Sequence, residues 1–152
     1  MISDLYSDKI LAAAAAAPMA RRLGSPDGSA TKHSRVCGSE VHVDLILDGD
    51  VISDFAMEAK ACALGQASAS ITAQNVVGAS AGELFILRDQ MFAMLKNNGA
   101  PPSGKRWQGL AVLESVRDYP QRHASIMLVF EAICASLEQA GFEPPTPAQH
   151  SP

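Results

Sequence analysis

The sequence is poor in cysteine, in basic charge and in long apolar runs. It has three cysteines among 152 residues, and so low and odd a count argues against a disulfide framework and for a reducing compartment. No run approaches the roughly 18 to 20 consecutive apolar residues that a membrane span requires. The formal net charge of −4 gives no electrostatic basis for nucleic-acid binding. We therefore expect a cytoplasmic protein that binds neither nucleic acid nor a membrane.

The apolar segment 10–17 has the wrong flanks for a secretory signal peptide. Acidic Asp4 and Asp8 precede it, where a basic region belongs, and Arg21 and Arg22 follow it. A signal peptide has the opposite order of charges. This pattern agrees with the cytoplasmic location expected from the cysteine count.

The composition suits one globular domain with a core, because 47% of the residues are hydrophobic and the chain is long enough to bury them. We expect this domain to span residues 1–140. Residues 141–152 are rich in proline and are expected to form a flexible tail.

An alternating segment in the first half predicts a β-hairpin. Apolar residues at every second position from Val41 to Leu47 are typical of a half-buried strand. Asp48-Gly49-Asp50 then predicts a tight turn. His42 and Asp44 fall on the outer face of this strand, where we expect them to be solvated. The returning strand is expected to point these residues inward: Val51, Ser53, Phe55, Met57 and Ala59.

Helical patterns surround this hairpin, so the expected fold class is α+β, a small antiparallel sheet packed against several helices. A Gly-, Ser- and Pro-containing connector over 21–32 is expected to be a loop. Ser80-Ala81-Gly82-Glu83 has the spacing of a helix-capping box. Helices are expected over residues 3–17 (capped by Ser3 or Asp4), 64–77, the segment after Ser80 up to Asn97, 107–116 and 119–140.

Two cysteines stand at the ends of these predicted elements. Cys37 precedes the first hairpin strand and Cys62 follows the second, so an antiparallel hairpin brings both thiols to one end of the sheet. A thiol at a helix N-terminus meets free backbone N–H groups and the positive end of the helix dipole, which favours thiolate. Lys60 is positioned to add to this effect. Thiolate binds metals and attacks sulfur, whereas Cys134, among apolar residues, is expected to be core.

These features together resemble the NifU N-terminal/IscU/SufU family of iron–sulfur cluster assembly scaffolds. The resemblance extends over roughly residues 3–138. It depends on Cys37-Gly38 entering the first strand, on Cys62 before the small-residue run 67–70, and on the 119–122 segment Tyr-Pro-Gln-Arg opening the last helix. The fold that the resemblance implies is the same α+β arrangement.

The resemblance implies a scaffold that is not an enzyme. Such a protein accepts sulfur from a cysteine desulfurase, binds iron and a transient iron–sulfur cluster through Cys37 and Cys62, and passes the cluster to apo iron–sulfur proteins. Two alternatives stay open. One is an accessory of the desulfurase that binds zinc or carries a persulfide, and the other is an interaction protein with an inert site.

The chain departs from the family pattern at two positions. The family's third cysteine falls at Ser125, and an aspartate that commonly follows Cys-Gly falls at Ser39. A hydroxyl is a poor ligand for soft metals, so a further ligand could come from His123, a partner or a second copy of the chain in a homodimer. On a regular helix His123 and Ser125 point about 200° apart, whereas Arg122 shares a face with Ser125 and could stabilise a thiolate or persulfide.

Overall fold

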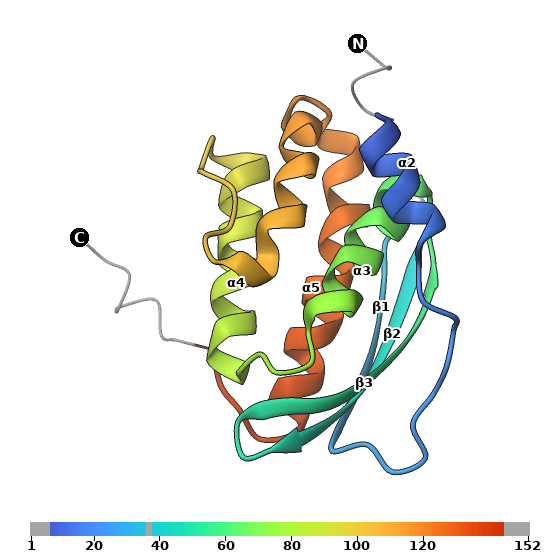
Figure 1. Cartoon of the computed structure of the whole chain (residues 1–152), viewed down its shortest axis with the longest axis vertical. Helices are drawn as coiled ribbons and strands as arrows, with labels where there is room; N and C mark the ends of the chain where they lie inside the picture. Colours follow the sequence, from blue (N-terminus) through green and yellow to red (C-terminus); the bar gives the residue numbers. More distant parts are fainter. Residues whose placement is uncertain (1–6, 36–37, 145–152) are drawn as a thin grey trace, which may run out of the picture.

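The computed structural model describes residues 7–35 and 38–144. They form a three-stranded antiparallel sheet in the order β1-β2-β3, with helices packed along one face (Figure 1), which confirms the α+β prediction. Cys37 and the end of the predicted tail, 145–152, lie outside the described residues. The elements are α2 (Asp8–Ala15), β1 (Gly28–His33), β2 (Glu40–Asp48), β3 (Val51–Lys60), α3 (Ala63–Asn75), α4 (Ala81–Lys96), the 3-10 helices η1 (Lys105–Asp118) and η2 (Pro120–Arg122), and α5 (His123–Gln139).

The predicted hairpin is present as β2 and β3, with Asp48 paired with Val51 across the turn. Gly49 lies in the turn with φ of 66°, a conformation that glycine adopts without steric cost. The prediction of a loop over 21–32 is wrong from Gly28 onward, because β1 pairs with β2 along Gly28–His33. The partner strand, more than the local composition, decides this conformation.

A register shift between Ile46 and Leu47 reverses which residues of β3 face the helices. On the side of the shift toward Lys60, Phe55 and Met57 are buried, as predicted. On the side toward the turn, Ile52 is buried and Ser53 is exposed, so the inward assignment of Val51 and Ser53 is wrong. An extra residue in one strand moves every later side chain to the opposite face.

The helices form layers on one side of the sheet (Figure 1). Helix α5 packs on β1 and β2, α3 packs on β3 and α5, and α4 lies against α5 away from the strands. Contact between α5 and β1 is close, because a Cβ at Gly28 would collide with the Ser136 carbonyl oxygen. Helix α5 is thus the central element, with one face toward the sheet and the other toward α4.

Hydrogen bonds at the helix ends agree with some sequence predictions and change others. The Ser80 hydroxyl accepts from the Glu83 N–H, as in the predicted capping box, but the Glu83 carboxylate accepts from the Trp107 indole instead of closing the box. Helix α2 is capped by Ser7 and ends at Ala15, whereas the predicted caps, Ser3 and Asp4, lie outside the described residues. The last long helix begins at His123, after the short 3-10 turn η2.

Within the described segments, no helix combines the length and apolar character needed to cross a membrane.

Residues 16–27, called the strap here, run from α2 across the outer side of the sheet to β1 (Figure 1). The Arg21 N–H donates to the Met57 carbonyl at 3.2 Å, and its guanidinium donates to the Phe55 carbonyl at 3.4 Å. The strap therefore bonds to backbone carbonyls of β3, which is an edge strand of the sheet in the described part of the chain.

The strap also covers Asp44, and the prediction that Asp44 is solvated is wrong. Its side chain has no exposed surface. One carboxylate oxygen accepts from Arg22 Nε at 2.8 Å and from the Leu23 N–H at 3.0 Å. The other accepts from the Ser29 hydroxyl at 2.5 Å and contacts His42 Nε2 at 2.8 Å. The alternation placed Asp44 on the correct face, but β1 and the strap remove that face from solvent.

Candidate functional site

Cys62 lies between the end of β3 and the first turn of α3, as the sequence predicts. Its backbone is extended, with φ of −66° and ψ of 173°, and it is the N-cap residue of α3. Its carbonyl accepts from the Gln66 N–H, the first bond of the helix. The thiol is half-buried. The side chain of Cys62 makes no capping hydrogen bond to the first turn of α3, so the thiol is left to contact residues outside its own helix.

Ser125 is the residue of α5 that faces this thiol. Its Oγ lies 3.3 Å from Cys62 Sγ and 3.4 Å from the Ser39 Oγ. Both serines are 3% exposed. The site therefore joins three segments: the entrance to β2, the start of α3 and the first turn of α5.

Gly65 permits this approach between α3 and α5. A Cβ at Gly65 would lie 2.5 Å from Ser125 Oγ and 2.7 Å from the Ala61 Cβ, closer than real Cβ contacts occur. Neither Gly65 nor Ser39 was assigned a role from the sequence. The signal for Gly65 was a glycine inside a predicted helix of small residues, which costs helix stability and often indicates close packing.

The described residues that flank Cys37 in the sequence lie at the same end of the sheet as Cys62, because His33 pairs with Glu40 and Glu40 with Lys60. Two backbone hydrogen bonds join these flanking residues, Ser34 N–H to Ser39 O at 2.8 Å and Gly38 N–H to Ser34 O at 2.9 Å. Gly38 has a positive φ of 70°. Because Cys37 itself lies outside the described residues, its proximity to Cys62 stays a prediction.

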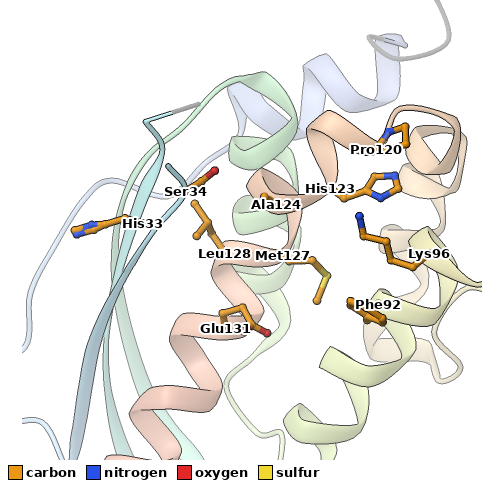
Figure 2. A pocket seen from close by; sticks show the side chains of 10 residues that line it. All are labelled: His33, Ser34, Phe92, Lys96, Pro120, His123, Ala124, Met127, Leu128 and Glu131. Carbon is orange, nitrogen blue, oxygen red and sulfur yellow. The ribbon is translucent and has the colours of Figure 1, made fainter. Parts of the chain in front are cut away.

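His123 does not lie with Cys62 and Ser125. Its Nε2 hydrogen-bonds the Val116 carbonyl of η1 at 2.9 Å, and burial lowers its pKa, against the effect of that bond. Figure 2 shows the ring beside Lys96 in a pocket between α4 and α5. The opposite directions of His123 and Ser125 agree with helical geometry. A direct role for His123 as the missing ligand gains no support from this arrangement.

The structure also places the other residues singled out from the sequence, which are Lys60, Arg122 and Cys134. Lys60 is exposed at the end of β3, opposite Glu40, and Arg122 is half-buried directly before α5. Cys134 is buried among core residues as predicted, and burial raises the pKa of its thiol to about 12. Among the described residues, no group of three or more His, Cys, Asp or Glu side chains could hold a metal ion. Of the two cysteines in the described segments, Cys62 is half-buried and Cys134 is buried.

The chain is similar in sequence to known proteins of one family. The family model for the NifU-like N terminal domain matches residues 5–125. The iron-sulfur cluster assembly scaffold protein IscU of Thermotoga maritima is 22% identical over 103 residues, which cover 68% of this chain and 71% of that protein. The protein of the same name from Streptococcus pyogenes serotype M1 is 26% identical over 104 residues, covering 68% of this chain and 65% of that protein.

Two solved structures share the fold. The NifU-like protein (N-terminal) from Brucella abortus, described as nitrogen-fixing, has 47% sequence identity and a TM-score of 0.89, and the match covers 91% of this chain and 96% of that one. The FiSufU protein of Fervidobacterium islandicum AW-1, a putative iron-sulfur cluster assembly scaffold protein for the SUF system, has a TM-score of 0.77 at 20% identity, with coverage of 89% and 98%. The second likeness concerns the fold alone.

Proposed function

This chain belongs to the family of NifU-like N-terminal domains, and from that membership we infer that it is a scaffold for iron–sulfur cluster assembly. The single observation that carries the inference within the chain is the half-buried Cys62 thiol at the N-terminus of α3. A thiolate there binds soft metals and accepts sulfur. The cluster is cargo that the protein binds and releases, so the chain acts by binding and transfer and not as an enzyme.

Cys37 and Cys62 supply the two thiolates of the proposed site. The loop from Ser34 to Ser39 closes at the same sheet end as Cys62, and Ser39 reaches Ser125, which supports placing Cys37 near Cys62. Lys60 and Arg122 are the cationic residues that flank the site in sequence. The coordination positions that these two thiolates leave open are filled by the partner that donates or receives the cluster, or by a second copy of the chain.

The proposed partners follow from the chemistry of the cargo. A cysteine desulfurase supplies sulfur as a persulfide, and apo iron–sulfur proteins receive the finished cluster. Both exchanges occur in the reducing conditions that the low cysteine count indicates, so we place the protein in the cytoplasm.

One observation favours a second candidate function. The side chain of α5 that faces Cys62 is the hydroxyl of Ser125, and a hydroxyl is a poor ligand for iron or zinc. A protein with this arrangement could serve as a sulfur-transfer accessory of the desulfurase, carrying a persulfide or zinc without assembling a cluster.

Anaerobic reconstitution with ferrous iron and sulfide tests the proposal. We expect a visible absorption band from a bound cluster in the wild type and its loss in Cys37→Ser and in Cys62→Ser. Cys134→Ser is the matched control, because its thiol is buried away from the site, and it is expected to keep the band. A colourless wild type, with or without bound zinc, would refute the scaffold function and favour the sulfur-transfer alternative.

A further inference from the structure

The Ser125 hydroxyl of α5 is directed at other side chains, whereas the buried hydroxyls of Ser68, Thr72 and Ser136 donate to backbone carbonyls. The Ser136 hydroxyl of α5 donates to the Ala132 carbonyl at 2.8 Å, and the Thr72 hydroxyl of α3 donates to the Ser68 carbonyl at 2.8 Å. Such bonds to the carbonyl four residues earlier are the usual arrangement for Ser and Thr inside a helix. The Ser125 hydroxyl instead contacts Cys62 Sγ and the Ser39 hydroxyl. It is therefore oriented toward the thiol and not toward its own helix.

Donor and acceptor rules give this contact a direction. A thiolate or a persulfide anion has no proton and can only accept. In the thiolate the charge is on Sγ, to which Ser125 must then donate. In a persulfide anion the charge is on the outer sulfur, one S–S bond beyond Sγ, and Ser125 must turn its O–H to that atom, while a lone pair of Ser125 can accept from Ser39 in either state. A chain of hydroxyls aligned in this way strengthens its terminal bond to the charged sulfur. Since both serines are 3% exposed, water competes little for these bonds.

The same residues bind iron poorly. Hydroxyl oxygens are weak ligands for soft metals, so Ser39 and Ser125 favour sulfur on Cys62 over a metal ion between the three side chains. The half-buried state of Cys62 leaves part of the sulfur open to a donor, while Ser125 contacts it from α5.

We propose that Ser125 and Ser39 are positioning residues that hold a persulfide on Cys62, so that sulfur is loaded on this residue before iron. The inference rests on the scaffold function proposed above and names the first cargo of that site. In the loading step the Cys62 thiolate attacks the outer sulfur of a donor persulfide. The S–S bond of the donor breaks, a new S–S bond forms on Cys62, and the outer sulfur keeps its proton while the donor leaves as a thiolate. One S–S bond replaces another, so no oxidant or reductant is needed.

Glutathione persulfide is the probe, because its use does not require recognition of a partner protein. Wild type, Ser125→Ala and Ser39→Ala are treated with it, then with a limited excess of dithiothreitol, and the surviving persulfide is alkylated. Peptide mass spectrometry reads Cys37 and Cys62 separately, since Lys60 provides a tryptic site between them. The quantity measured is the lifetime of the persulfide on each cysteine.

Ser125→Ala is expected to shorten the persulfide lifetime on Cys62 roughly tenfold, the usual effect of one hydrogen bond to a charged group, and to leave Cys37 unchanged. Ser39→Ala, which acts through Ser125, is expected to have a smaller effect of about threefold. Ser136→Ala is the matched control, a buried serine of the same helix bonded to backbone, and should match the wild type at both cysteines.

Two results would overturn the inference. One is an unchanged Cys62 persulfide in Ser125→Ala, and the other is an equal loss at Cys37 and Cys62, which would indicate a general disturbance of the fold. Cluster reconstitution on the same preparations separates the two proposals. A wild-type cluster with no dependence of the Cys62 persulfide on Ser125 removes this inference alone, whereas a Ser125-dependent persulfide without any cluster supports it and removes the scaffold function.

Discussion

The protein contains two polar clusters that differ in how completely their central group is bonded. Asp44, on the outer side of the sheet, is fully buried and accepts from Arg22, Leu23 and Ser29, with His42 in contact. Cys62, at the end of the sheet, is half-buried and has the Ser125 hydroxyl as its side-chain contact. The Asp44 carboxylate is bonded on both oxygens by other residues of the chain, whereas part of the Cys62 sulfur stays accessible to a ligand from outside the protein.

This difference separates a structural cluster from a functional one. Burial alone would raise the pKa of Asp44, but hydrogen bonds from Ser29, Arg22, Leu23 and His42 hold it well below its usual range. Because these partners occupy its oxygens, the Asp44 carboxylate has no open position for a ligand. A nucleophile or metal ligand must keep an open position, as Cys62 does. Altering either cluster should therefore affect stability and sulfur chemistry to different degrees.

Asp44→Ala is expected to have the largest effect on stability. It removes the acceptor of several buried hydrogen bonds and leaves Arg22 and Ser29 without it, which should lower the free energy of unfolding by about 3 kcal/mol. Urea denaturation of the variant and the wild type measures this loss. The folded fraction should still form a persulfide on Cys62. A stable variant with defective sulfur chemistry would reverse the roles assigned to the two clusters.

The same cluster predicts a pH dependence. Because the folded-state pKa of Asp44 lies below its unfolded value of about 3.9, its contribution to stability is complete above that value and is lost as the pH falls below it. Unfolding free energies measured from pH 7 downward should therefore decline more steeply in the wild type than in Asp44→Asn. Parallel curves for the two proteins would show that Asp44 does not carry the effect.

Gly65→Ala should affect the Cys62 cluster with a moderate cost in stability. The added methyl group would lie 2.5 Å from Ser125 Oγ, so α3 and α5 must separate at the site, at a cost of about 1–3 kcal/mol. Persulfide lifetime on Cys62 should fall as in Ser125→Ala. Gly82→Ala is the matched control, a helical glycine with no atom within 4 Å of the added Cβ, and is expected to be neutral or slightly stabilising. Equal behaviour of the two variants would contradict the close-packing argument.

The smallest expected effect comes from Cys134. Burial raises the pKa of this thiol to about 12, so at pH 8 iodoacetamide should alkylate Cys62 and leave Cys134 unmodified in the folded protein. Peptide mass spectrometry after brief labelling checks this, with labelling in denaturant as the reference for full reactivity. Rapid labelling of Cys134 under native conditions would mean that the core opens easily around α5.

The sequence predicts the hairpin and the junction at Cys62 because local patterns determine them. Alternation from Val41 to Leu47 and the Asp48-Gly49-Asp50 turn define β2 and β3, and Cys62 follows where the alternation ends. The register shift between Ile46 and Leu47, which leaves Ser53 of β3 without a paired residue, was not predictable, since a one-residue shift in pairing leaves no trace in hydrophobic alternation.

The remaining errors concern residues whose environment is made by distant segments. β1 is a strand because β2 pairs with it, and Asp44 is buried because the strap covers it. The contact of Ser39 with Ser125 joins positions 86 residues apart. Such pairs follow from the tertiary arrangement, which propensity and periodicity do not describe. The direction of His123 relative to Ser125, by contrast, follows from the helical repeat alone.

The position of the strap has a consequence for self-association. β3 is an edge strand of ten residues, and a long edge strand is a template on which another chain can add a strand. By donating to the Met57 and Phe55 carbonyls, Arg21 occupies the acceptors that an incoming strand would need. The strap therefore hinders the addition of a second chain's strand along this edge of the sheet.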